Sequence, residues 1–145
     1  MAGEAIVKVG TTKTLEANGA SCAYGVIVQA DDASYGIVAD GATYPDAEFA
    51  LAVTFSVAPT ENTVISLVAR PLNIDGTNDA DVPEFQRQVQ FIGNFIVNNV
   101  TTTQYLWLMG YELPREADYY LANNAGQTIS AGWTLKVTPR TLGSA

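Results

Sequence analysis

The sequence predicts an all-β protein, an antiparallel β-sandwich or a related jelly-roll-like fold. Three observations point to this class. Apolar and polar residues alternate over several stretches, as they do in strands that bury one face. Stretches rich in Pro, Gly, Asn and Asp separate these segments, and no segment shows a sustained helical period. The 145 residues fit one domain, which can bury about two-thirds of its unfolded surface.

The first 45 residues are rich in Ala, Gly, Thr and Asp and contain only short apolar runs. These runs are AIVKV at 5–9, YGVIV at 24–28 and YGIVA at 35–39. We expect two or three short strands here, or an extended N-terminal arm that becomes ordered against a neighbour. Residues 1–45 are expected to form part of the same domain as the β-sandwich core, which we assign to residues 46–145.

Three longer segments show the clearest alternation, at 47–57, 89–98 and 128–137. Gly93 interrupts the apolar face of the second segment, which indicates a bulge or a close approach of the backbone. Their apolar faces predict the core, which should bury Phe49, Leu51, Val53, Phe55, Phe91, Phe95, Trp133 and Leu135.

Shorter strands are expected at 63–69, 104–109 and 118–123, where apolar and aromatic residues cluster. Turn-forming residues occupy the connections between them. Pro114, for example, lies between the second and third of these segments, and Gly126 follows the third. Several short strands separated by turns within one domain favour a sandwich or a jelly roll.

Composition argues against several classes of function. The chain has no histidine, which removes Ser-His-Asp and Cys-His catalysis and His-ligated zinc. Cys22 is the single cysteine, so it has no disulfide partner within the chain, and we expect it to pack as a small apolar residue. We therefore predict a protein that is not an enzyme and that uses no cofactor.

Charge and hydropathy also limit the partners. The net charge is −8 and neither half of the chain offers a basic patch, so direct binding to nucleic acid is not expected. No apolar run reaches the roughly 18 residues that a spanning helix needs. The sequence therefore predicts no association with a membrane.

The stretch RPLNIDGTNDADVPEF at 70–85 is the most unusual connection. Asn and Asp side chains stabilise turns, and the two prolines favour extended ends, so we expect a shaped connector that is ordered without metal. Paired carboxylates for glycoside hydrolysis are another reading, but no third catalytic group is identifiable. A calcium site is a further alternative; the spacing does not match an EF-hand, and the candidate ligands are Asn73, Asp75, Asn78, Asp79 and Asp81.

Aromatic residues form a second group of candidates. They could build a face on which sugars stack, although packing in the core or in an interface is the interpretation that we favour. The residues concerned are Tyr105, Trp107, Tyr111, Tyr119 and Tyr120.

Three stretches resemble small virion proteins of tailed bacteriophages, of the head decoration (cement) type. These are RPLNIDGTNDADVP, FIGNFIVNNVTTTQYL and LPREADYYLANNAGQTISAGWTLKVTPRT, and the resemblance covers about residues 64–141. It implies a β-rich, cofactor-free structural protein that is often a trimer. The implied partners are the major capsid protein and further copies of the chain, and the implied location is the outer capsid surface of the virion.

The AIVKV run is our candidate for capsid docking, because an extended segment can add a strand to an exposed sheet edge. Its residues are Ala5, Ile6, Val7, Lys8 and Val9. The alternatives to a capsid decoration protein are a tail-associated virion protein and a β-sandwich module that binds carbohydrate or a host surface. An exposed aromatic platform would favour the binding module. An ordered N-terminal arm, with aromatic residues buried between subunits, would favour the decoration protein.

Overall fold

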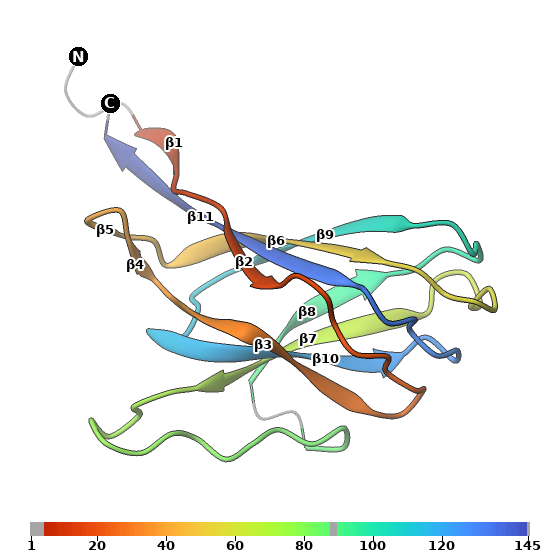
Figure 1. Cartoon of the computed structure of the whole chain (residues 1–145). Helices are drawn as coiled ribbons and strands as arrows, with labels where there is room; N and C mark the ends of the chain where they lie inside the picture. Colours follow the sequence, from red (N-terminus) through yellow and green to blue (C-terminus); the bar gives the residue numbers. More distant parts are fainter. Residues whose placement is uncertain (1–4, 88–89, 145) are drawn as a thin grey trace.

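The computed structural model, which describes residues 5–87 and 90–144, is a sandwich of two antiparallel β-sheets (Figure 1). The first sheet, sheet A, has the order β1–β11–β6–β9, and β2 also pairs with β11. Its strands are β1 Ala5–Val9, β2 Lys13–Glu16, β6 Asp46–Val53, β9 Gln104–Gly110 and β11 Thr134–Ser144. The described residues contain no helix, so the predicted all-β class is confirmed.

The second sheet, sheet B, has the order β3–β10–β7–β8. A short hairpin of two further strands follows β3. The strands of sheet B are β3 Ile27–Gly36, β7 Val64–Pro71, β8 Phe91–Ile96 and β10 Glu116–Asn124, and those of the hairpin are β4 Val38–Ala39 and β5 Ala42–Thr43. The first 45 residues thus supply strands to both sheets, and β3, with ten residues, is longer than the sequence indicated.

The predicted strand at 128–137 is shifted in the structure. The regular strand β11 begins only at Thr134 and continues to Ser144. Gly132 has a φ of +94°, which interrupts the extended backbone just before the strand starts. Ile129, on the other side of this turn, forms isolated bridges with Cys22 and Phe55.

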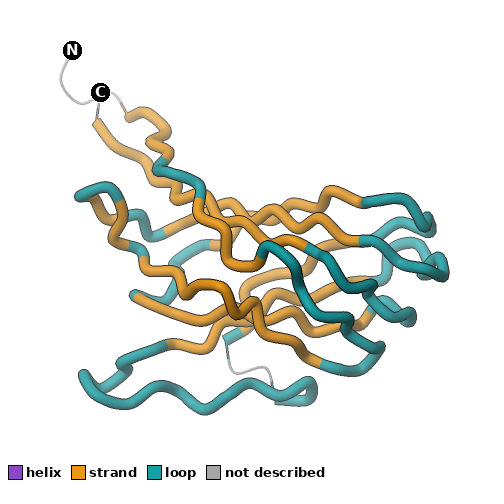
Figure 2. Tube along the Cα trace, viewed as in Figure 1, coloured by secondary structure: helices purple, strands orange, loops and turns teal. Residues whose placement is uncertain are grey.

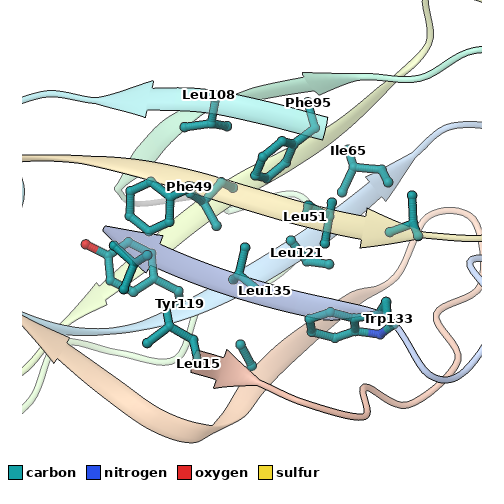
Figure 3. Packing of buried hydrophobic residues seen from close by; sticks show 14 of the residues in the cluster. Leu15, Phe49, Leu51, Ile65, Phe95, Leu108, Tyr119, Leu121, Trp133 and Leu135 are labelled. Atoms are coloured by element: carbon teal, nitrogen blue, oxygen red, sulfur yellow. The ribbon is translucent and has the colours of Figure 1, made fainter. Parts of the chain in front are cut away.

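The core lies between the two sheets and is built from large aromatic and branched side chains (Figure 3). Seven of the eight predicted core residues are buried, and Phe91 is the exception because 51% of its side chain surface is exposed. The pairing of β7 with β8 shifts register between Leu67 and Val68, which places Phe91 opposite the outward-facing Val68. The bulge that Gly93 indicated therefore turns Phe91 away from the core, and that prediction was wrong for this residue. Val89 lies outside the described residues.

Sheet B is covered on its outer side as well. Val68, Tyr120 and Ala122 form a second buried cluster there, and Phe85 packs against it. Phe85 belongs to the long connection from β7 to β8, which runs along the outer side of this sheet (Figures 1 and 2). Because both faces are buried, the central part of β7 is apolar without strict alternation. Sheet A has no comparable cover among the described residues, and its outer face is the open face of the sandwich.

Candidate functional site

The open face of sheet A carries a line of exposed aromatic side chains. On β9, Tyr105, Trp107 and Met109 alternate with side chains that point toward the core, and Tyr111 follows directly after the strand. The exposed fraction is 84% for Tyr105, 59% for Trp107 and 69% for Tyr111. We call these three residues the aromatic row. Isolated exposed hydrophobic residues are normal, but two on one face of β9 and a third directly after it mark a candidate binding surface.

Small and polar side chains lie beside the aromatic row. Ala50 and Ala52 of β6 are opposite the first two rings, and Lys136 and Thr134 of β11 are opposite the same alanines on the other side. Because alanine side chains are short, a shallow hollow of about 150 Å³ remains between Tyr105 on one side and Thr134 and Lys136 on the other. The hollow is therefore aromatic on one side and polar on the other.

A second hollow of about 200 Å³ lies at the Tyr111 end of the row. Arg140 of β11 lines it and donates a hydrogen bond to Glu48 Oε1 at 3.2 Å, in an ion pair that is about one-third exposed on each side. Leu142, farther along β11, also lines this hollow. It connects the aromatic row to the end of the sheet where β1 lies.

The predicted docking segment at 5–9 forms strand β1, which pairs antiparallel with residues 140–144 of β11. Pairing between β11 and β6 ends at Arg140, so residues 141–144 pair with β1 alone. The resulting two-stranded ribbon extends away from the sandwich next to both chain termini (Figure 1). We call residues 5–9 and 140–144 the terminal ribbon.

The terminal ribbon exposes apolar side chains on a pair of strands with little support behind them. Ile6, Val7 and Val9 are each 43% to 58% exposed, and Leu142 is 71% exposed. Lys8 is paired with Thr141, and its side chain reaches Gly143, where an added Cβ would overlap it. The side chain of Ala5 and the whole of residues 1–4 lie outside what the structure describes. A two-stranded ribbon is marginally stable by itself in water, so contact with a partner would stabilise it.

Three of the five candidate calcium ligands, Asp75, Asn78 and Asp79, have side chains that form hydrogen bonds within their own loop. Asp75 Oδ1 accepts from the backbone N–H groups of Thr77 and Asn78, at 3.0 and 2.7 Å. Asp75 Oδ2 accepts from the Asn78 side chain at 2.8 Å, and this bond is the main reason that the pKa of Asp75 falls to about 2. Asp79 Oδ1 accepts from the Asn73 backbone N–H at 3.0 Å. The prediction that side chains hold this loop through its own backbone is confirmed for Asp75 and Asp79, whereas the Asn78 side chain bonds to the Asp75 carboxylate instead.

Two arginines attach the loop to the rest of the molecule. Arg70 Nε donates to the carbonyl of Ala80 at 2.7 Å, and Arg115 Nη2 donates to the carbonyl of Asn73 at 2.8 Å. Asp81, the last calcium candidate, lies 3.6 Å from Arg87 Nη1 in an exposed ion pair. Arg70, Arg115 and Asp81 thus each have a bonding partner within the protein.

We expect a chelator to leave the melting temperature of the protein unchanged. The loop carboxylates already bind backbone N–H, amide and guanidinium groups, so no cation is needed to offset their charge. Thermal unfolding in EDTA and in excess calcium measures this directly. A drop of many degrees in EDTA that calcium restores would show that the loop is a calcium site.

One group of three carboxylates does converge elsewhere in the described part of the chain. Oxygen atoms of Glu16, Asp31 and Asp32 lie within 4.8 Å of one another, at the junction of β2 and β3. The Asp31 backbone N–H donates to Glu16 and the Ala17 backbone N–H donates to Asp32. Burial raises the pKa of Glu16. These bonds link β2 of sheet A to β3 of sheet B, so the group has a structural role at the edge of the sandwich.

Cys22 is buried, as predicted, and its Sγ lies 3.3 Å from the carbonyl oxygen of Val26. Burial raises the pKa of its thiol to about 11, so it stays protonated and unreactive near neutral pH. Burial also raises the pKa of Tyr35 to about 12 and that of Tyr119 further. Both tyrosine hydroxyls are buried without a hydrogen-bond partner among the described residues.

The aromatic candidates divide into two groups. Tyr119 and Tyr120 are buried, as the packing interpretation predicted. The three residues of the aromatic row are exposed in this chain, so they do not pack in its core, and packing in an interface stays a prediction for them. The sequence could not separate the groups because only strand pairing, of β9 with β6 and of β10 with β3 and β7, reveals which face each side chain occupies. The row is an exposed aromatic platform, which is the feature expected of a binding module. The strand at 5–9 is one of the two features expected of a decoration protein, an ordered N-terminal segment.

No protein-family model matches the chain, and no curated protein matches it. The described residues also contain no helix that is long and apolar enough to cross a membrane. Function must therefore be inferred from the two exposed surfaces, the terminal ribbon and the aromatic row.

Proposed function

We propose that this chain is a non-catalytic virion protein that decorates the outer surface of a bacteriophage head and stabilises it. The observation that carries the proposal is the terminal ribbon, which presents exposed apolar side chains on strands with unpaired edges. The resemblance over residues 64–141 supports assignment to a virion. The net charge of −8 favours the outer face, away from packaged DNA.

Docking would use the free backbone edges of the ribbon. Among the described residues, no strand pairs with the second edge of β1 or with the far side of residues 141–144, so both are available to a partner strand. Strand addition supplies backbone hydrogen bonds, and the exposed valine and leucine side chains supply apolar burial. The partner would be the major capsid protein, through an exposed edge of one of its sheets.

Stabilisation of the head would follow from mass action. A docked subunit that buries about 1,600 Å² of total surface has an interface of standard size. Because such a subunit binds the assembled lattice and not dispersed capsid subunits, its binding free energy adds to the stability of the lattice. We propose that the working form is a homo-oligomer, a trimer, since several subunits would then dock together. A monomer in light scattering, both in concentrated solution and on the particle, would contradict the oligomer.

The test compares binding of ribbon variants to heads purified from the particles that carry this 15.4 kDa chain. Deleting residues 1–9, or replacing the facing pair Val7 and Leu142 with Asp, should abolish co-sedimentation with heads while the sandwich stays folded. The matched control is Val38→Asp, because Val38 is also exposed, at 67%, but lies on β4. Its binding should equal that of the unaltered protein.

Two results would contradict the proposal. One is full decoration of heads by the ribbon variants, which would exclude the ribbon as the docking element. The other is the absence of this chain from purified virions in mass spectrometry, which would exclude the virion role itself.

A further inference from the structure

The aromatic row and two small hollows beside it, one lined by Tyr105 and one by Tyr111, form a strip on the open face of sheet A that we call the trough. At about 3.4 Å per residue, the row from Tyr105 to Tyr111 is roughly 20 Å long. The hollow of about 150 Å³ is smaller than the roughly 300–1,000 Å³ of pockets that enclose a drug-sized ligand. A ligand of this surface would therefore lie along it in an extended form.

The two sides of the trough differ in chemistry. Rings of the aromatic row form one side, and Thr134, Lys136 and Thr138 of β11 form the other. With β6 between them, the two sides are about 10 Å apart. A sugar ring has apolar C–H faces, which stack on aromatic rings, and an edge of hydroxyl groups, which bond to threonine hydroxyls and lysine ammonium groups. The trough offers both kinds of contact side by side.

Charge on this face is balanced, although the whole chain carries −8. Asp46 and Glu48 of β6 lie opposite Arg140 and Thr138 of β11, and Lys136 is the second base on the face. Two acids and two bases cancel, and Glu48 already pairs with Arg140 at 3.2 Å. An acidic polymer would meet no net positive charge here and would be repelled by the rest of the molecule. The balance suits an uncharged ligand.

The arrangement differs from a typical protein interface, in which aromatic residues sit in a continuous apolar centre that is depleted of charge. Here the rings form a single line, and Lys136 and Glu48 lie within two strands of it. From the rings, the polar opposite side and the charge balance, we propose that the aromatic row binds a neutral polysaccharide. This activity is independent of docking through the terminal ribbon.

The test is native affinity electrophoresis of the full chain in gels that contain one neutral polysaccharide each. The panel is hydroxyethyl cellulose, laminarin, xylan, galactomannan, mannan and amylose. At least one polymer should retard the protein. Replacing Trp107 with Ala should weaken binding to that polymer by about tenfold or more, as expected for a lost stacking contact. Titration of tryptophan fluorescence with the same polymer gives the affinity.

Tyr24→Ala is the matched control, because Tyr24 is 57% exposed but lies outside sheet A, in the connection between β2 and β3. It should bind as the unaltered chain does, and both variants should keep its melting temperature. Migration that no polymer retards would overturn the proposal, as would equal binding by Trp107→Ala. A Trp107→Ala chain whose oligomeric state changes in light scattering would also overturn it, since the row would then cover another copy. Because the test uses no phage heads, its outcome does not depend on docking through the terminal ribbon.

Discussion

Replacing Gly19 with Ala should destabilise the protein by about 3 kcal/mol, the upper end of the usual range for forcing extra volume into a well-packed site. A Cβ at this position would lie 2.0 Å from Cε2 of Trp133. The backbone has little freedom to retreat, because the Gly19 N–H donates to the Trp133 carbonyl at 2.9 Å and the Gly19 carbonyl accepts from Gly132 at 2.8 Å. The ring is also held, since its Nε1 donates to the Ala20 carbonyl at 2.8 Å. Urea denaturation measures the loss.

Gly36→Ala is the matched control, because a Cβ there would lie 3.5 Å from its nearest neighbour, the Arg115 carbonyl oxygen. We expect a change of less than about 1 kcal/mol for it. A double-mutant cycle adds a second check: in a Trp133→Leu background the cost of Gly19→Ala should fall sharply, since the ring is gone. Equal stability of the two alanine variants would contradict the close approach of Gly19 to the tryptophan.

Local patterns in the sequence predicted the sandwich because inward and outward residues alternate wherever a strand has only one buried face. Strand β6 is the clearest case, with Phe49, Leu51 and Val53 inside. Prediction failed where backbone geometry breaks the alternation. The bulge before Gly93 turned Phe91 outward, and the turn at Gly132 delayed the start of β11. A glycine does not by itself specify how the register continues beyond it.

The candidate surfaces were harder to predict because they depend on strand order. Nothing local in the sequence shows that β9 is an edge strand, or that residues 141–144 extend beyond β6. The covering of sheet B by the connection after β7 was equally hidden, because it depends on contacts between Phe85 and residues far along the chain. The turn chemistry of that connection, in contrast, is local, and the hydrogen bonds of Asp75 follow directly from it.

A difference in how the outer faces of the two sheets are covered also explains why both proposals concern sheet A. The outer face of sheet B forms a second buried cluster under the long connection, so this face contributes to the stability of the fold. Sheet A leaves its outer face and its terminal ribbon open, with most of the largest exposed aromatic side chains on one edge. A single domain can thus anchor itself through one end of sheet A and present the aromatic row on the other part of the same face.

Replacing Asn123 with Asp should cost about 3–5 kcal/mol at pH 7, as for a buried charge without a partner. Asn123 is fully buried, and its Nδ2 donates to the carbonyls of Cys22 and Gln127, at 2.9 and 2.8 Å. Its Oδ1 accepts from the Ala125 backbone N–H at 2.9 Å. Aspartate can still accept the hydrogen bond from the Ala125 N–H. Its other oxygen, however, brings negative charge close to the carbonyl oxygens of Cys22 and Gln127. Asn124→Asp, an exposed neighbour with the same change of charge, should cost less than about 0.5 kcal/mol.

The stability cost of Asn123→Asp should depend on pH, and the burial of this position determines the direction of the change. Burial and the two carbonyls raise the pKa of the new carboxyl in the folded state above its unfolded value of about 3.9. The folded variant then binds a proton more tightly than the unfolded variant, so its stability relative to the unaltered protein rises as pH falls from 7 toward 4. The protonated acid can donate to one of the carbonyls, which restores part of the lost bonding. Denaturant midpoints of both proteins at pH 7, 5.5 and 4 measure the difference, and a gap that stays constant or widens on acidification would contradict a buried Asn123 with these partners.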